Sequence, residues 1–162
     1  MIFVTVGTNE APFDRLLEAL PRSRGAELFV QHGPSRVRPS GARCVESLPY
    51  EGVLDAMRSA DVVVTHAGVG SILTALAAGK RPVVVPRLRR YGEAVDDHQL
   101  AFARHLGPTG LVRVVEDASA LERELEDRDG RFVAMELGAS TELVRELRDL
   151  LSNLLGPPRY SR

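Results

Sequence analysis

Short apolar runs alternate along this chain with stretches in which apolar residues recur at helical spacing. Residues 2–6, 61–65 and 82–86 are rich in Val and other apolar side chains, which is typical of strands buried on both faces of a sheet. Segment 13–20 carries Phe and Leu at positions i, i+3, i+4 and i+7, the stripe of an amphipathic helix. This alternation predicts an α/β fold with a doubly wound, mostly parallel, Rossmann-like sheet.

The same alternation continues over most of the chain. Two polar stretches interrupt it, and the first, 32–41, lacks periodicity and is expected to be a surface connection. The second, 87–97, is too polar for a core and follows a predicted strand at the edge where open α/β sheets place ligands, so it is a candidate lid or ligand wall. Weaker strands are predicted at 28–31, 43–46 and 111–115, and further helices at 51–59, 69–77, 94–106 and 118–127.

The length of 162 residues suits one domain. We expect it to span 1–156, to end in an amphipathic helix at about 140–155, and to leave a tail at 157–162. Such a terminal helix most often packs on its own domain, and its mixed-sign polar face disfavours binding to a membrane. Its apolar stripe consists of Leu143, Val144, Leu147, Leu150, Leu151, Leu154 and Leu155.

Composition narrows the classes of function. The net charge of −1 argues against a dedicated nucleic-acid binder. The single cysteine, Cys44, can form neither an internal disulfide nor a multi-cysteine metal site, which favours a reducing, cytoplasmic setting. No apolar run approaches the roughly 20 residues that span a bilayer, and no signal peptide is expected. The 4 histidines include no close pair at ligand spacing, so no metal site is expected.

The strongest chemical signal is the turn 65–71, with the sequence THAGVGS, between a predicted buried strand and an amphipathic helix. Gly68 and Gly70 allow a ligand to approach the backbone closely, and Ser71 offers a hydroxyl. The helix start presents unpaired N–H groups and the positive end of its dipole, and a diphosphate suits such a site. The alternative is that these glycines only form a tight turn.

Two better-known phosphate motifs do not fit this segment. A P-loop requires Gly-Lys followed by Ser or Thr, whereas Lys80 is followed by Arg81 at the far end of the predicted helix. A dinucleotide fingerprint requires a third glycine where Leu73 stands.

Two further polar segments are expected at the same sheet edge. The first is the turn 7–9, and the second is 97–99, at the start of a predicted helix. Asp97 is read as a helix cap in the simplest interpretation, whereas Gln99 can both donate and accept hydrogen bonds, which suits sugar hydroxyls. His66 and His98 can titrate near neutral pH.

Four blocks in the same order resemble the C-terminal domain of family 28 glycosyltransferases. They are FVTVGT with FDRL at 3–16, ADVVVTHAGVGSIL at 60–73, GKRPVVVP at 79–86 and DDHQLAFA at 96–103. The chain is most similar to stand-alone small subunits of split enzymes, of the dolichol-linked N-acetylglucosaminyltransferase type and the bacterial exopolysaccharide type. The resemblance implies the nucleotide-sugar half of a GT-B glycosyltransferase.

The resemblance also implies roles for individual residues. The HAG-x-GS turn would hold the diphosphate, the D-x-HQ block the donor sugar, and the first turn would face the cleft near that sugar. The family commonly has an acid at the position of Thr74, which implies a weaker ribose contact here. The implied nucleotide-sugar-binding residues are Gly7, Thr8, Asn9, His66, Ala67, Gly68, Val69, Gly70, Ser71, Thr74, Asp97, His98 and Gln99, with Leu48, Pro49 and Tyr50 beside the uracil.

The leading hypothesis is the donor-binding subunit of a glycosyltransferase, peripheral at the membrane through a membrane-associated partner. It would move a hexose-type sugar, of the N-acetylglucosamine or glucuronic acid class, from a UDP-sugar to a lipid-linked or polysaccharide acceptor, with no cofactor. Helix amides would stabilise the leaving group without metal, and the acceptor base is expected on the partner. The alternatives are a non-catalytic nucleotide-sugar-binding or regulatory module and a phosphate-binding hydrolase or epimerase.

Overall fold

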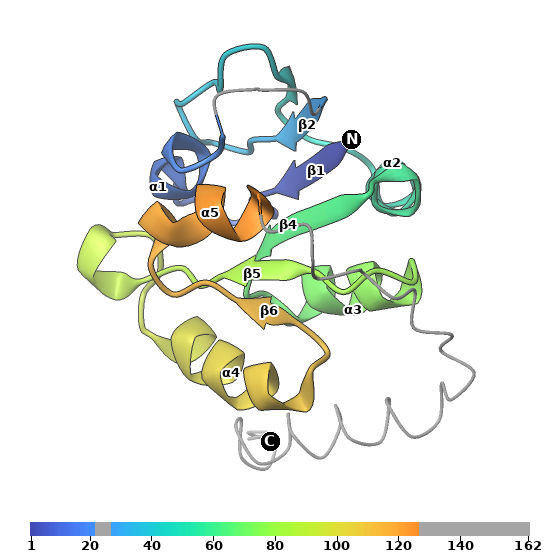
Figure 1. Ribbon diagram of the computed structural model, residues 1–162. Coiled ribbons are helices and arrows are strands. Elements are labelled where there is room, and N and C mark those ends of the chain that lie inside the picture. Colours follow the sequence, from blue (N-terminus) through green and yellow to red (C-terminus); the bar gives the residue numbers. More distant parts are fainter. Residues whose placement is uncertain (22–26, 127–162) are drawn as a thin grey trace, which may run out of the picture.

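The computed structural model describes residues 1–21 and 27–126, which form a parallel six-stranded sheet with helices on both faces (Figure 1). Every described strand pair is parallel, as the alternation of strands and helices predicts. The strands are β1 (Ile2–Thr5), β2 (Leu28–Gln31), β3 (Arg43–Val45), β4 (Val62–His66), β5 (Val83–Val85) and β6 (Arg113–Val114).

Helices connect most of these strands. The α-helices are α1 (Asp14–Glu18), α2 (Tyr50–Ser59), α3 (Val69–Ala77), α4 (His98–Leu106) and α5 (Leu121–Glu126). Short 3₁₀ turns lie at η1 (Arg89–Tyr91), η2 (Gly107–Thr109) and η3 (Ala118–Ala120).

The strand order β3-β2-β1-β4-β5-β6 places the first strand in the interior of the sheet. The chain moves outward from β1 to β3 and then returns to pair β4 with the other side of β1. Connections therefore leave β1 and β4 in opposite directions, so the carboxyl ends of these strands form the topological switch point, the edge at which open α/β sheets bind ligands in a crevice. We call this edge the switch-point crevice. The turns after Thr5 and His66 lie at this switch point.

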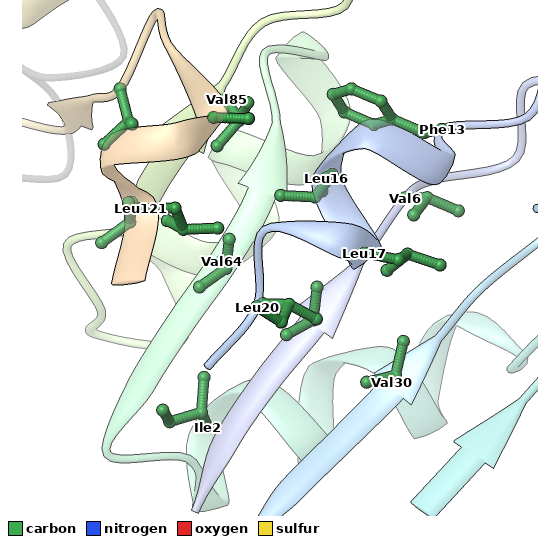
Figure 2. Close-up of a cluster of buried hydrophobic side chains, with 14 of the residues drawn as sticks. Ile2, Val6, Phe13, Leu16, Leu17, Leu20, Val30, Val64, Val85 and Leu121 are labelled. Carbon is green, nitrogen blue, oxygen red and sulfur yellow. The ribbon is translucent and has the colours of Figure 1, made fainter. Parts of the chain in front are cut away.

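Alternate residues of the central strands feed separate cores on the two faces of the sheet. On one face Val4 and Val64 pack with α1 and with Leu121 of α5 (Figure 2). On the other face Phe3 and Val63 pack with α2 and α3. A third cluster joins α3 to α4. Because both faces are covered, the strands are apolar nearly throughout, as their sequences predict.

The observed elements correct several predicted boundaries. Helix α4 begins at His98 rather than at 94, since Glu93 is buried in the preceding loop and Asp96 accepts a hydrogen bond from the His98 amide. β6 is shorter than the predicted strand at 111–115, and η3 replaces the first turn of the predicted helix at 118–127. The connection 32–41 is only partly a surface loop, because Ser35 is buried and accepts a hydrogen bond from the Phe13 amide at 2.8 Å.

The predicted terminal helix at 140–155 and the tail at 157–162 lie outside the described residues. Among the helices that the structure describes, none has the length and apolar character needed to cross a bilayer.

Candidate functional site

The site is built around His66, the last residue of β4, whose ring lies between two glycine backbones. A Cβ atom placed on Gly7 would lie 2.2 Å from His66 Nε2, and one on Gly68 would lie 2.0 Å from His66 Cε1. Both distances are far shorter than any real contact, so both positions require glycine. Gly7 also has φ of +78°, a conformation that side chains disfavour. The two turns can approach each other because neither carries a side chain at this point.

Buried polar side chains hold the Gly7 turn in place. Thr5 Oγ1 accepts a hydrogen bond from the Gly7 amide at 3.1 Å, and its own hydroxyl donates to Gln31 Oε1. Gln31 Nε2 then donates to the Gly7 carbonyl at 3.1 Å. Neither Thr5 nor Gln31 is among the site residues predicted from the sequence. One feature of the sequence could have indicated them: Thr5 and Gln31 are the polar last residues of two otherwise apolar strands, β1 and β2.

His66 is neutral at physiological pH. Burial, and to a smaller extent the positive charge of Arg87, lower the pKa of the imidazole from 6.5 to about 4, although hydrogen bonding with the Gln99 side chain partly opposes them. His66 Nε2 lies 3.0 Å from Ser71 Oγ, which joins the end of β4 to the first turn of α3. The histidine therefore serves as an uncharged spacer and hydrogen-bonding partner beneath the turn.

A neutral buried histidine makes stability depend on pH. The unfolded chain takes up a proton near pH 6.5, whereas the folded chain resists protonation until about pH 4, so stability is lost as the pH falls through this window. We expect the free energy of unfolding to fall by about 2 kcal/mol from pH 7 to pH 5, measured by urea denaturation. His66→Gln should remove most of this dependence. An equal dependence in that variant would contradict the assignment.

Helix α3 presents its amino terminus at the crevice. Gly68 is the N-cap residue, with an extended conformation (φ −81°, ψ 132°), and no side chain of the described residues caps the helix. The amides of Val69, Gly70 and Ser71 precede the first intrahelical donor, Ile72, which bonds to the Gly68 carbonyl at 3.1 Å. A Cβ on Gly70 would meet no described atom within 4 Å. The helix therefore offers free amides, a positive dipole end and open space, the requirements of an anion site.

The structure brings the D-x-HQ segment to the same edge of the sheet. Gln99 is buried and its Oε1 accepts a hydrogen bond from the Arg87 amide at 3.2 Å. Asp97 does not cap α4 with its side chain, because its Oδ1 accepts a hydrogen bond from the Arg89 amide at 2.9 Å. Asp96 bonds to both the amide and the ring of His98, and these bonds hold the pKa of its carboxyl below the usual range.

The remaining predicted site residues follow β1 and β3 or lie on α3, and the structure gives them mostly local contacts. Thr8 and Asn9 are exposed after Gly7, and Asn9 Oδ1 accepts a hydrogen bond from the Ala11 amide at 2.8 Å. Thr74 donates its hydroxyl to the Gly70 carbonyl of its own helix at 2.8 Å. The segment Leu48 to Tyr50 follows β3 and starts α2, with Tyr50 61% exposed.

The loop 87–97 is more than a surface wall. Its composition predicts a segment too polar for a core, yet Arg87, Leu88 and Glu93 are almost completely buried. The Glu93 carboxylate is paired with Arg15 at 2.8 Å and also accepts a hydrogen bond from the Leu88 amide, which satisfies its charge inside the fold. The rest of the loop is mostly exposed, at Arg89, Arg90, Tyr91, Gly92, Val95, Asp96 and Asp97. The expectation of a polar surface loop therefore holds for these residues, whereas bonds to Arg15 and to distant backbone carbonyls draw Glu93 and Arg87 into the fold.

Comparison with known proteins settles the family. Residues 1–130 match the family described as "Glycosyltransferase family 28 C-terminal domain". The chain belongs to this family. In this family 28 domain, the switch-point crevice and the THAGVGS turn therefore lie on a glycosyltransferase scaffold. Among the residues that the structure describes, no group of His, Cys, Asp and Glu side chains is arranged to hold a metal ion.

Relatives of this family 28 domain include longer transferases and a subunit. A Sorangium cellulosum protein named "UDP-N-acetylglucosamine--N-acetylmuramyl-(pentapeptide) pyrophosphoryl-undecaprenol N-acetylglucosamine transferase" is 29% identical over 124 residues, or 70% of this chain and 30% of the relative. A Nitratidesulfovibrio vulgaris protein of the same name is 35% identical over 67% of this chain and 29% of the relative. The Yarrowia lipolytica "UDP-N-acetylglucosamine transferase subunit ALG13" is 29% identical over 65% of this chain and 60% of that subunit.

Solved structures support the fold. The glycosyltransferase SnogD from Streptomyces nogalater superposes with a TM-score of 0.58 at 23% sequence identity, covering 94% of this chain and 40% of that one. The "Glycotransferase of kitacinnamycin" superposes with a TM-score of 0.50 at 21% identity, covering 96% of this chain and 39% of that one. The described sheet is thus the fold of one part of a GT-B glycosyltransferase.

Proposed function

We propose that this chain is the donor-binding subunit of a glycosyltransferase that moves a hexose-type sugar from a UDP-sugar to a lipid-linked or polysaccharide acceptor. The observation that carries the proposal is the uncapped start of α3, with open space at Gly70, set against the Gly7 turn at the switch point. Family membership supports the reaction class, and the printed names of the relatives favour UDP-N-acetylglucosamine as the donor.

The diphosphate would lie against the amides of Val69, Gly70 and Ser71. When the bond between the anomeric carbon and the phosphate oxygen breaks, negative charge grows on the leaving UDP. Amides that already point at this position stabilise that charge without reorganising. Gln99 and His98, at the start of α4, would lie against the hexose, and Tyr50 against the uracil.

The acceptor side would come from a second, membrane-associated subunit. One relative is itself named a transferase subunit, which supports a partner, and the chain spans 60% of that Yarrowia lipolytica subunit and 30% of the Sorangium transferase. We place the base that deprotonates the acceptor hydroxyl on that partner. The proton would leave the hydroxyl as its oxygen attacks the anomeric carbon.

Titration of the isolated chain with UDP in a calorimeter tests the donor site. We expect saturable binding that persists in EDTA, because helix amides rather than a metal would hold the diphosphate. Uridine should bind at least about tenfold more weakly, since it lacks the charged groups that the helix dipole attracts. No detectable UDP binding would overturn the proposal.

A second function, a non-catalytic nucleotide-sugar-binding module, is favoured by one observation. The Thr74 hydroxyl donates its hydrogen to the Gly70 carbonyl, so it could accept a hydrogen bond from the ribose hydroxyls but not donate one to them. Co-expression with the partner subunit, followed by an assay of sugar transfer to a lipid-linked acceptor, separates the two functions. Tight UDP binding without transfer of any sugar would favour the binding module.

A further inference from the structure

Arg87 follows β5 and is completely buried, although its guanidinium carries a charge. Its Nη2 donates to the Val6 carbonyl at 2.9 Å. Its Nη1 donates to the carbonyls of Ala11 at 2.9 Å, Glu93 at 3.2 Å and Pro12 at 3.3 Å. All four acceptors are neutral backbone groups, so these bonds solvate the cation without neutralising it.

No carboxylate of the described residues is hydrogen-bonded to the Arg87 guanidinium. Glu93 acts on Arg87 electrostatically, but its carboxylate is held by Arg15, through Nε at 2.9 Å and Nη2 at 2.8 Å. Arg15 is partly exposed and also interacts with Asp117, whereas Arg87 is the fully buried cation of this cluster. Burial lowers the pKa of Arg87 to about 10, and Glu93 opposes the effect. A buried charge is costly unless an opposite charge lies nearby.

This cation lies where the segments of the candidate site meet. Val6, which accepts from Arg87, directly precedes Gly7, and Gln99 accepts from the Arg87 amide. The charge of Arg87 also acts on His66, which lies between the two glycine turns. The same side chain stacks on Phe13, with Cζ 4.7 Å from the ring centroid. Arg87 thus joins the β1 turn, the 87–97 loop and the start of α4.

We propose, resting on the donor site proposed above, that Arg87 is a positioning residue whose buried charge balances the nucleotide diphosphate without touching it. The ligand would supply an anion to a buried guanidinium whose hydrogen bonds go only to backbone carbonyls. Because Arg87 is fully buried, its attraction to the diphosphate should be screened less than that between exposed charges. The expected signature is selective: Arg87 should favour ligands that carry phosphate charge over neutral ligands that occupy the same crevice.

The test compares the dissociation constants of UDP and of uridine in three variants of the full chain. Arg87→Met should weaken UDP binding by about tenfold or more while changing uridine binding much less. Arg87→Lys keeps the charge but not the planar fork, so it should retain the preference for UDP. Arg104→Met is the charge-matched control, because Arg104 is 61% exposed in a surface pair with Glu116 and should leave the preference unchanged.

A second readout separates charge from structure. The pKa of His66, followed by NMR titration, should rise in Arg87→Met, since the opposing positive charge is gone. Equal weakening of UDP and uridine, with no rise in that pKa, would show a merely structural role and overturn the inference. Should Arg87→Met not fold, loss of the UDP preference in folded Arg87→Lys would overturn it as well. Failure of the unaltered chain to bind UDP would instead refute the donor site itself.

Discussion

Gly70→Asp is expected to abolish UDP binding while leaving the domain folded. Gly70 is exposed and a Cβ there would meet no described atom, so the fold can accept a side chain. An aspartate in the first turn of α3 should even stabilise the helix by about 0.5 kcal/mol, because its negative charge lies at the positive end of the helix dipole. Its carboxylate, however, would occupy the space and the charge position of the diphosphate. Like charges at such a distance should weaken binding by at least about a hundredfold.

Gly70→Asn is the matched control, because asparagine has nearly the same shape without the charge. Calorimetric titration should show a much smaller loss of UDP affinity in this variant, while urea denaturation gives similar stability for both. Unchanged UDP affinity in Gly70→Asp would mean that the glycine turn is only structural. Equal loss in both variants would point to steric exclusion rather than to charge.

Gly68→Ala is expected to destabilise the domain strongly, although a single methyl group is added. The backbone of Gly68, at φ −81° and ψ 132°, is one that alanine adopts freely, so conformation is not the obstacle. The obstacle is the His66 ring, 2.0 Å from the new Cβ. The ring cannot move away, because Gly7 closes its other side. We expect a loss of about 2–3 kcal/mol in the free energy of unfolding, typical of severe overpacking.

A double-mutant cycle isolates this clash. In a His66→Ala background the methyl group of Gly68→Ala has room, so the second substitution should cost less than about 1 kcal/mol. Urea denaturation of the four proteins measures the coupling energy. An equal cost in both backgrounds would show that His66 does not limit the space at Gly68.

The site shows which features a local pattern can predict. The THAGVGS turn was predicted because an apolar run, two glycines and an amphipathic stripe stand next to one another in the chain. The same local signals predict where α3 begins and ends, and the helix is found at Val69–Ala77, as expected. Roles of individual residues toward a ligand, by contrast, came from the resemblance and stay predictions.

Arg87 shows what such a pattern misses. Its sequence neighbours include Arg89 and Arg90, and a run of arginines is typical of a solvated loop. Burial of Arg87 depends on carbonyls supplied by Val6 and Ala11, which are distant in sequence. Gln31 likewise acts through a contact that is distant in sequence, because its side chain donates a hydrogen bond to the Gly7 carbonyl. The periodicity of apolar residues in a helix or strand cannot predict such hydrogen bonds between residues that are far apart in the sequence.

The amino-acid sequence by itself determined the alternation of strands and helices, the parallel sheet and the glycine turn before α3, because short-range periodicity and backbone freedom decide these features. The tertiary structure alone decided that Gly7 and Gly68 enclose His66, that this histidine is neutral, and that Arg87 is a buried cation beside it. These properties depend on desolvation and on charges brought together by the strand order, and both arise only when distant segments pack.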